Sequence, residues 1–249
     1  MLHRFVSTFL AFLFRLDLGI IACMKLVLAS QGFTTPEIAA AVVELVGKDA
    51  VHINIAIINE AYVDIGPGRD ESWLIDELVL LKQYFAGTVS FVNLRAYDLQ
   101  EIEQRLEFAD VLYIVGGAQM VLPKLFREIG FDTLLAKMIE RKVVVGTSAG
   151  ANVLGRQIED SAYWEDQYGS AADYLTQPTF GFVDFNILPH FERADHPRRT
   201  AQRLAPLLEH HPFKLYGLTD TQAVVYDDGD VRFVGGKPAI FGGQPSSVN

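Results

Sequence analysis

Short apolar runs alternate with amphipathic stretches along most of this sequence, and this alternation restricts its fold more than any other feature. The run at residues 25–29 is followed by a helix start, where Thr35 can act as N-cap and Pro36 suits the first helical position. The run at 52–58 is typical of a strand buried on both faces. Strands separated by helices run parallel and have helices on both faces. We therefore predict an α/β fold with a Rossmann-like, mostly parallel sheet.

The alternation of expected strands and helices continues to the C-terminal region, with one interruption. Residues 157–180 have no clear period, and we expect a loop region there, over the site. Three aspartates and a glycine at 227–230 indicate a hairpin turn. The remaining expected strands cover 88–93, 110–115, 142–145, 182–188, 214–218, 223–226 and 231–234, and the expected helices cover 35–46, 70–85, 98–107, 121–129, 133–141 and 197–210.

Composition argues against several kinds of partner. The 249 residues contain 21 Lys and Arg against 31 Asp and Glu, a formal net charge of −10, so we expect no nucleic-acid partner. The single cysteine, Cys23, cannot form an internal disulfide, and no Cys/His cluster has metal-ligand spacing. Neither a Walker-type loop nor a dinucleotide fingerprint occurs. We therefore expect no metal and no cofactor.

The first 23 residues differ from the rest. They contain an apolar stretch at 5–14 that resembles the start of a signal peptide, but charged residues from Arg15 onward interrupt it, and about ten residues cannot span a bilayer. Met24 directly precedes the first expected strand. We interpret 1–23 as an upstream extension and 24–249 as one cytoplasmic α/β domain with no membrane partner. Export or anchoring through the extension is the alternative.

A candidate nucleophile follows the strand expected at 142–145. The sequence Gly-Thr-Ser-Ala-Gly at 146–150 fits the G-x-S-x-G elbow, a sharp strand-to-helix turn that exposes a serine hydroxyl. Ser148 is the expected nucleophile, and the Ala149 amide would face the developing oxyanion. A glycine pair ending at Gly117 closes another expected strand and could supply the second amide. The alternative is a small-residue turn in which Ser148 only caps a helix.

A serine nucleophile needs a base, and His190 is the histidine best placed for this role. It follows the strand expected at 182–188, at the edge of the sheet where Ser148 should lie. A carboxylate would complete the site by orienting the imidazole. From the residues alone several acids remain open, namely Glu159, Asp160, Glu165, Asp166 and Asp220.

Four segments between residues 24 and about 243 resemble the peptidase E family of aspartyl dipeptidases, serine relatives of the class I glutamine amidotransferase fold. The nucleophile motif is the most specific of the four. They are Lys-Leu-Val-Leu-Ala-Ser-Gln-Gly-Phe at 25–33, Tyr-Ile-Val-Gly-Gly at 113–117, Gly-Thr-Ser-Ala-Gly-Ala-Asn at 146–152 and Phe-Asn-Ile-Leu-Pro-His-Phe at 185–191.

The resemblance implies a class I glutamine amidotransferase-like fold. It also implies that Ser148 is the nucleophile, that His190 is the base, and that the amides of Gly117 and Ala149 form the oxyanion hole. The implied activity is serine-type hydrolysis of short peptides, chiefly dipeptides with an N-terminal Asp. An acidic substrate would need a cation, for which the candidates are Arg193, Arg198 and Arg199.

The chain departs from the family at the third member of the triad. The family's acid lies between the serine and the histidine, and by register this position falls near Tyr163. We therefore take Glu165, just beyond it, as the first candidate for the acid. Because of this departure, two other functions stay open. One is a non-catalytic module that binds a small ligand, and the other is a different hydrolase of the same fold, such as a cyanophycinase-type peptidase or an esterase. A homodimer is also compatible with the sequence.

Overall fold

The computed structural model describes residues 24–63 and 70–243. The interpretation of residues 1–23 lies outside the described residues. None of the helices in these two ranges is long and apolar enough to cross a membrane. The elements are β1 (Lys25–Ala29), α2 (Pro36–Val46), η1 (Ala50–His52), β2 (Ile55–Ile58), α3 (Glu60–Val63), α4 (Ser72–Tyr84), β3 (Val89–Phe91), α5 (Leu99–Glu107), β4 (Val111–Ile114), α6 (Val121–Ile129), α7 (Phe131–Met138), β5 (Val143–Thr147), α8 (Ala149–Asn152), α9 (Ser161–Tyr168), α10 (Ala172–Thr176), β6 (Asn186–Leu188), α11 (Ala201–Leu208), β7 (Lys214–Gly217), β8 (Ala223–Asp227), β9 (Asp230–Val234) and β10 (Ala239–Gly242).

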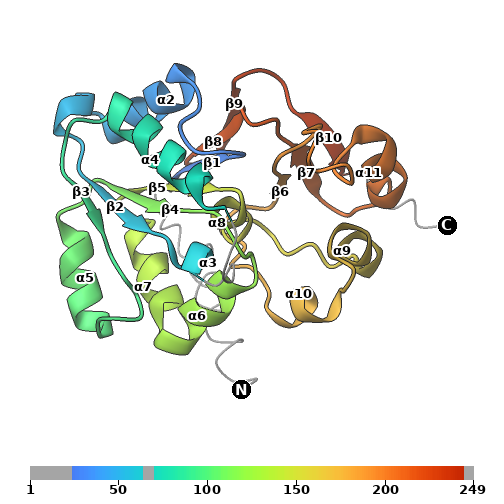
Figure 1. The fold of residues 1–249 in the computed structure, drawn as a ribbon, viewed down its shortest axis with the longest axis horizontal. Helices are drawn as coiled ribbons and strands as arrows, with labels where there is room; N and C mark the ends of the chain where they lie inside the picture. The colour runs from blue at the N-terminus through green and yellow to red at the C-terminus, as the bar shows by residue number, and fades with distance from the viewer. Residues whose placement is uncertain (1–23, 64–69, 244–249) are drawn as a thin grey trace.

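The large sheet has seven strands in the order β3-β2-β4-β5-β1-β8-β9. The first five run parallel, and β8 and β9 are antiparallel additions at one edge. Helices α2 and α4 lie on one side of the sheet, and α5, α6 and α7 lie on the other (Figure 1). The predicted α/β fold, with a mostly parallel sheet and helices on both faces, is confirmed.

Alternate side chains of the central strands divide the core into two layers. Leu26 and Leu28 pack in the layer on one face, and Val27 and Ala29 pack in the layer on the other. All four are completely buried. This two-sided burial explains why the strands read as continuous apolar runs instead of alternating ones.

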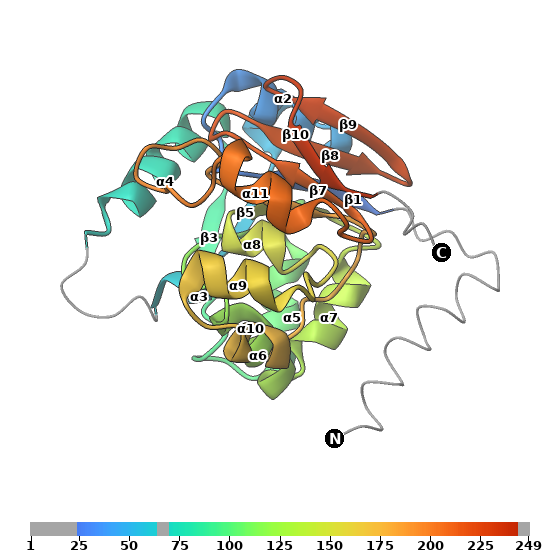
Figure 2. The same ribbon diagram turned by 90° about the vertical axis from the view of Figure 1, so that its right-hand side faces the viewer.

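A smaller sheet, in the order β10-β7-β6, lies beside the large one (Figure 1). Strands β6 and β7 are parallel, and β10 is antiparallel to β7. Figure 2 shows α9 and α11 on this side of the molecule, where they share a separate apolar cluster with the small sheet. Because β6 and β7 are parallel neighbours, the segments that follow them leave from the same edge, which places His190 near Asp220.

The prediction of a loop at 157–180 is wrong, because the segment contains α9 and α10. The Asp160 side chain caps α9 by accepting a hydrogen bond from the Tyr163 amide at 3.1 Å, and Gly169 ends it with φ 77°. Both signals were present in the sequence. The helix lacks an apolar stripe because it buries two adjacent aromatic residues, Tyr163 and Trp164, and exposes most of the rest.

Element boundaries shift elsewhere by a few residues. Strand β2 begins at Ile55 instead of His52, because residues 50–52 form a short 3-10 helix. Strand β10 was not predicted. The hairpin at 227–230 is confirmed, with Asp228 and Gly229 at φ 51° and 100°, as a tight turn between twisted strands requires.

Candidate active site

Strand β5 ends in a sharp turn at Ser148, which has φ 50° and ψ −115°. Glycine flanks this turn because neighbouring backbone leaves no room for a side chain. A Cβ on Gly150 would lie 2.1 Å from the Ile114 carbonyl oxygen, and one on Gly146 would lie 2.5 Å from the Gly150 oxygen. The elbow predicted from the glycine spacing is therefore formed, and its serine occupies the strained position.

Three side chains from different segments form a continuous hydrogen-bonded series. Ser148 Oγ lies 3.0 Å from His190 Nε2, and His190 Nδ1 lies 2.7 Å from Asp220 Oδ1. Ser148 follows β5 in the large sheet, His190 follows β6 in the small sheet, and Asp220 lies between β7 and β8. This is the geometry of a nucleophile, a base and an orienting acid.

The charge of Asp220 determines which nitrogen of His190 carries the proton. Burial raises the pKa of Asp220, but hydrogen bonds from His190, Arg193 and Ser30 outweigh burial and bring the pKa below its usual range. The carboxylate is thus ionised at neutral pH and can only accept hydrogen bonds. His190 Nδ1 must therefore donate to Asp220 at 2.7 Å, so Arg193 Nη1, 3.1 Å from the same nitrogen, is a close contact and not a hydrogen bond to it. This leaves Nε2 free to accept the proton of Ser148.

Burial lowers the pKa of the His190 imidazole, and the positive charges of Arg193 and Arg199 lower it further. The hydrogen bond and charge of Asp220 act in the opposite direction without reversing the shift. A histidine with a pKa below 6.5 is mostly neutral at pH 7, which is the form that can act as a base.

Two further side chains, Ser30 and Arg193, hold Asp220 and His190. Ser30 was not singled out from the sequence, and Arg193 was expected only as a cation for an acidic substrate. The Ser30 hydroxyl accepts from the His190 amide at 2.7 Å and donates to Asp220 Oδ1 at 2.8 Å. Arg193 Nη1 donates to the second oxygen of Asp220 at 3.0 Å. Ser30 directly follows β1 and so lies at the same edge of the sheet as the elbow. This position at the end of an expected strand is the sequence feature that could have identified Ser30 as a site residue.

An asparagine pair joins the nucleophile helix to the strand before His190. Asn152 Nδ2 donates to Asn186 Oδ1 at 3.0 Å and to the Ile187 carbonyl oxygen at 2.7 Å. Asn186 returns a hydrogen bond to the Asn152 carbonyl oxygen at 3.1 Å. Both asparagine side chains are buried, so this link fixes α8 against β6 and keeps Ser148 in register with His190.

The two residues expected to form the oxyanion hole border the elbow. A Cβ on Gly116 would lie only 3.5 Å from Ser148 Oγ, so this turn passes directly beside the nucleophile. Gly117 has φ 137°, and a Cβ there would lie 2.4 Å from the Ala61 carbonyl oxygen. Within the described residues, the amides of Gly117 and Ala149 have no hydrogen-bond partner. Both amides are thus available to an oxyanion.

Glu165, the acid first expected, does not contact His190. It lies exposed on α9, beside Asp166, which pairs with Arg203. Asp160 caps the same helix. The structure brings Asp220 to His190 instead, because the parallel pairing of β6 and β7 brings the segments after these two strands together. In the hydrogen-bonded series the order along the chain is serine, histidine and acid, whereas the resemblance implied serine, acid and histidine.

The three candidate cations differ in position. Arg193 bonds Asp220 and Asp195. Arg198 is exposed and donates to a backbone carbonyl oxygen of α9. Arg199 donates to the Pro189 carbonyl oxygen at 2.8 Å and to a tyrosine hydroxyl at 2.8 Å, next to the base. Of the three, Arg199 combines closeness to His190 with hydrogen bonds to neutral groups alone.

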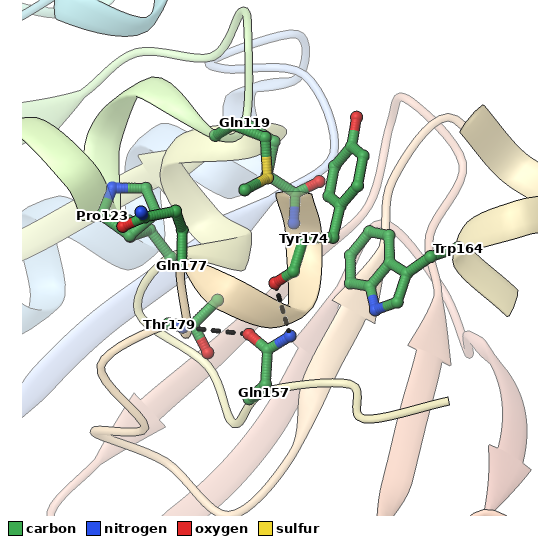
Figure 3. Close-up of a pocket in the computed structure, with 9 residues that line it drawn as sticks. Gln119, Pro123, Gln157, Trp164, Tyr174, Gln177 and Thr179 are labelled. Atoms are coloured by element: carbon green, nitrogen blue, oxygen red, sulfur yellow. Dashed lines mark hydrogen bonds between the residues drawn. The ribbon is translucent and has the colours of Figure 1, made fainter. Parts of the chain in front are cut away.

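A narrow cavity of about 10 Å³ lies between the turn after β4 and the α9–α10 region (Figure 3). Gln157 braces one wall, donating to the Tyr174 carbonyl oxygen at 3.2 Å and accepting from the Thr179 amide at 3.0 Å. The cavity has room for about one water molecule and has no charged group in its lining. Its lining residues are Gln119, Met120, Pro123, Val153, Gln157, Trp164, Tyr174, Gln177 and Thr179.

Metal-ligating side chains do not gather in the part of the chain that the structure describes: no group of three or more His, Cys, Asp or Glu could hold an ion there.

Comparisons with known proteins point to peptidases. The profile of peptidase family S51 matches residues 69–234, about two thirds of the chain. An uncharacterized peptidase of Listeria monocytogenes is 29% identical over 106 residues, which cover 41% of this chain and 50% of that protein. The chain thus spans about half the length of this curated relative.

Two solved structures share the fold. A candidate peptidase E protein from Listeria monocytogenes superposes with a TM-score of 0.67 at 19% identity, covering 85% of this chain and 98% of that one. A peptidase from an acI-B1 actinobacterium gives a TM-score of 0.62 at 19% identity, covering 90% and 93%. The predicted class I glutamine amidotransferase-like fold is confirmed.

The reactivity of Ser148 distinguishes Asp220 from Glu165 as the acid that orients His190. A fluorophosphonate ester reacts rapidly with a serine only when a base activates its hydroxyl. We expect labelling of the wild type, labelling of Asp220→Asn slower by about 100-fold or more, and labelling of Glu165→Gln at nearly the wild-type rate. Intact-mass spectrometry over time measures each rate. An unchanged rate in Asp220→Asn, or an equal loss in Glu165→Gln, would contradict the assignment of Asp220.

Proposed function

The chain belongs to peptidase family S51, and from that membership we propose that it is a serine peptidase whose triad is Ser148, His190 and Asp220. The observation that carries the proposal is the unbroken hydrogen bonding from the Ser148 hydroxyl through His190 to Asp220, with distances of 3.0 and 2.7 Å. A module that only binds a ligand has no need for an aligned nucleophile and base.

In this mechanism His190 Nε2 takes the proton of Ser148 as Oγ attacks the peptide carbonyl carbon. The Asp220 carboxylate stabilises the imidazolium that forms. The oxyanion accepts hydrogen bonds from the amides of Gly117 and Ala149. His190 then gives its proton to the leaving amine as the C–N bond breaks, and an ester to Ser148 remains. Water hydrolyses this ester with His190 again as base.

Short peptides, above all dipeptides with an N-terminal Asp, are the proposed substrates. An aspartate side chain needs a cation close to the nucleophile, and Arg199 meets this requirement. Its guanidinium donates to the carbonyl oxygen of Pro189, the residue before His190, so it lies near the base. A guanidinium has five N–H donors, and Arg199 uses two in its bonds to Pro189 and Tyr168. The remaining donors suit a substrate carboxylate.

The decisive experiment is hydrolysis of a panel of X-Ala and Asp-X dipeptides by the wild type and by Ser148→Ala. We expect cleavage of Asp-X peptides, with a loss of at least about 10³-fold in the variant because the nucleophile is absent. Chromatography of the released amino acids measures both rates. Cleavage of other peptides, or of β-linked aspartyl polymers, would support the serine peptidase activity and contradict the proposed substrate. No hydrolysis and no labelling of Ser148 would favour a binding module.

The pH profile should follow the protonation of His190. Its pKa in the folded protein lies below 6.5, and only the neutral form can act as a base. The kcat/KM value should therefore rise with pH through a midpoint below about 6.5 and stay level through pH 7. Steady-state assays from pH 4 to 8 measure this midpoint, and a midpoint above 6.5 would contradict the description of the base.

The matched control for the pH profile is His196→Asn. The His196 ring stacks on His190 at 5.1 Å, and burial together with nearby positive charge lowers its pKa to about 4. Above about pH 5 His196 is mostly neutral and places no charge beside His190, so its replacement should leave the midpoint near the wild-type value.

Substrate selection should depend on Arg199. We expect Arg199→Gln to raise KM for Asp-X dipeptides by about ten-fold or more, since a charge-assisted hydrogen bond to the substrate is lost, and to change the rate of fluorophosphonate labelling of Ser148 little. Arg198→Gln is the control, because this neighbouring arginine is exposed and bonds only the Asp166 carbonyl oxygen. An unchanged KM for Asp-X dipeptides in Arg199→Gln, or an equal loss in Arg198→Gln, would contradict the role of Arg199 as the receptor for aspartate.

A further inference from the structure

A second series of hydrogen bonds lies behind the nucleophile and takes no part in the proposed proton transfers. The Gly32 amide donates to Thr147 Oγ1 at 2.7 Å. The Tyr113 hydroxyl donates to the Glu77 carboxyl group, and the Thr147 hydroxyl lies close enough to Tyr113 to lower its pKa. These side chains come from α4, β4 and β5, and they are at most 3% exposed.

The chemistry of its members gives this series one direction. An amide N–H can only donate, so Thr147 Oγ1 accepts at Gly32 and its own proton points to Tyr113. The Tyr113 proton then points to Glu77, where the carboxyl group accepts. Hydrogen bonds aligned in this way polarise and strengthen one another.

The buried carboxyl group calls for a physical reason. Desolvation raises the pKa of Glu77 to about 7, and the hydrogen bond from Tyr113 is the one opposing influence among the described residues. Tyr113, its hydrogen-bond partner, belongs to an apolar layer of the core that includes Phe33 and Phe85. A carboxyl group in such surroundings destabilises a fold, and its presence there indicates a role beyond packing.

The series packs directly against the loop that follows β1. Gly32 has φ 38°, and a Cβ there would lie 2.7 Å from the Tyr113 hydroxyl and 2.8 Å from Glu77 Cγ. Two residues earlier, Ser30 holds both the His190 amide and the Asp220 carboxylate. At the other end, Thr147 immediately precedes Ser148. The series therefore links the nucleophile to the loop that supports the base and the acid.

We propose that Glu77, Tyr113 and Thr147 are positioning residues for hydrolysis. They hold the loop at 30–32 against the end of β5, and thereby set the separation between Ser148 Oγ and His190 Nε2. The inference rests on the proposed serine peptidase activity. None of the three residues touches the substrate, so their effect falls on kcat and on the reactivity of Ser148, not on KM.

Tyr113→Phe removes the central hydroxyl and keeps the ring. We expect kcat and the rate of fluorophosphonate labelling to fall about ten-fold per folded molecule, with KM within two-fold of the wild type, since small misplacements of reacting groups are costly. Tyr216→Phe is the matched control. Tyr216 is a buried tyrosine of β7 that packs on Phe185 and Phe233, and its variant should keep the wild-type kcat and labelling rate.

Glu77→Gln tests the end of the series with an isosteric group that still accepts a hydrogen bond. We expect a smaller loss of kcat than in Tyr113→Phe, and the double variant should lose no more than Tyr113→Phe alone, because both changes interrupt one unit. A wild-type labelling rate in folded Tyr113→Phe, or losses that multiply in the double variant, would overturn the inference.

Amide hydrogen exchange separates this inference from the proposed function. The Gly32 amide should exchange at least about ten-fold faster in Tyr113→Phe than in the wild type or in Tyr216→Phe, whether or not a substrate is known. If the wild type neither labels nor hydrolyses peptides, the proposed function fails. If it does both and Gly32 exchange is unchanged in Tyr113→Phe, the positioning role fails.

Discussion

The hydrogen bond between His190 and Asp220 is the interaction on which the site depends. At 2.7 Å from an ionised carboxylate, His190 Nδ1 has to carry the proton, and the opposite nitrogen can then only accept. The fold provides this bond through the parallel pairing of β6 and β7, whose final residues, Leu188 and Gly217, are in register. The small sheet thus positions His190 and Asp220, and the large sheet positions Ser148.

Backbone strain is concentrated around Ser148 and His190. Three of the four non-glycine residues with positive φ in the described ranges are Ser148, His190 and Glu192, at 50°, 57° and 58°. Such conformations cost about 1–3 kcal/mol each and persist only where the surroundings hold them. The surroundings here are the buried strands of the elbow and the asparagine pair that ties α8 to β6. The fold thus offsets this strain with the stability of its two-sided core.

Much of this structure could be predicted from the sequence, because the fold and the elbow depend on local patterns. Apolar runs and glycine spacing predicted the parallel sheet and Ser148, and the end of a strand predicted His190. The acid could not be identified in the same way. Asp220 lies 30 positions after His190, and it reaches the base only through β-strand pairing that no local pattern encodes. Helix α9 was missed for a similar reason, since Trp164 packs against a separate cluster and the helix has no periodic apolar stripe.

The most direct test of the account is the tautomer of His190, measured by nitrogen-15 NMR of the histidine ring in the wild-type protein at pH 7 to 8. We expect a proton on Nδ1 held by Asp220 and an unprotonated Nε2 facing Ser148, with Nδ1 losing this preference in Asp220→Asn. A ring protonated on Nε2 instead would contradict it, because that nitrogen could not accept the Ser148 proton.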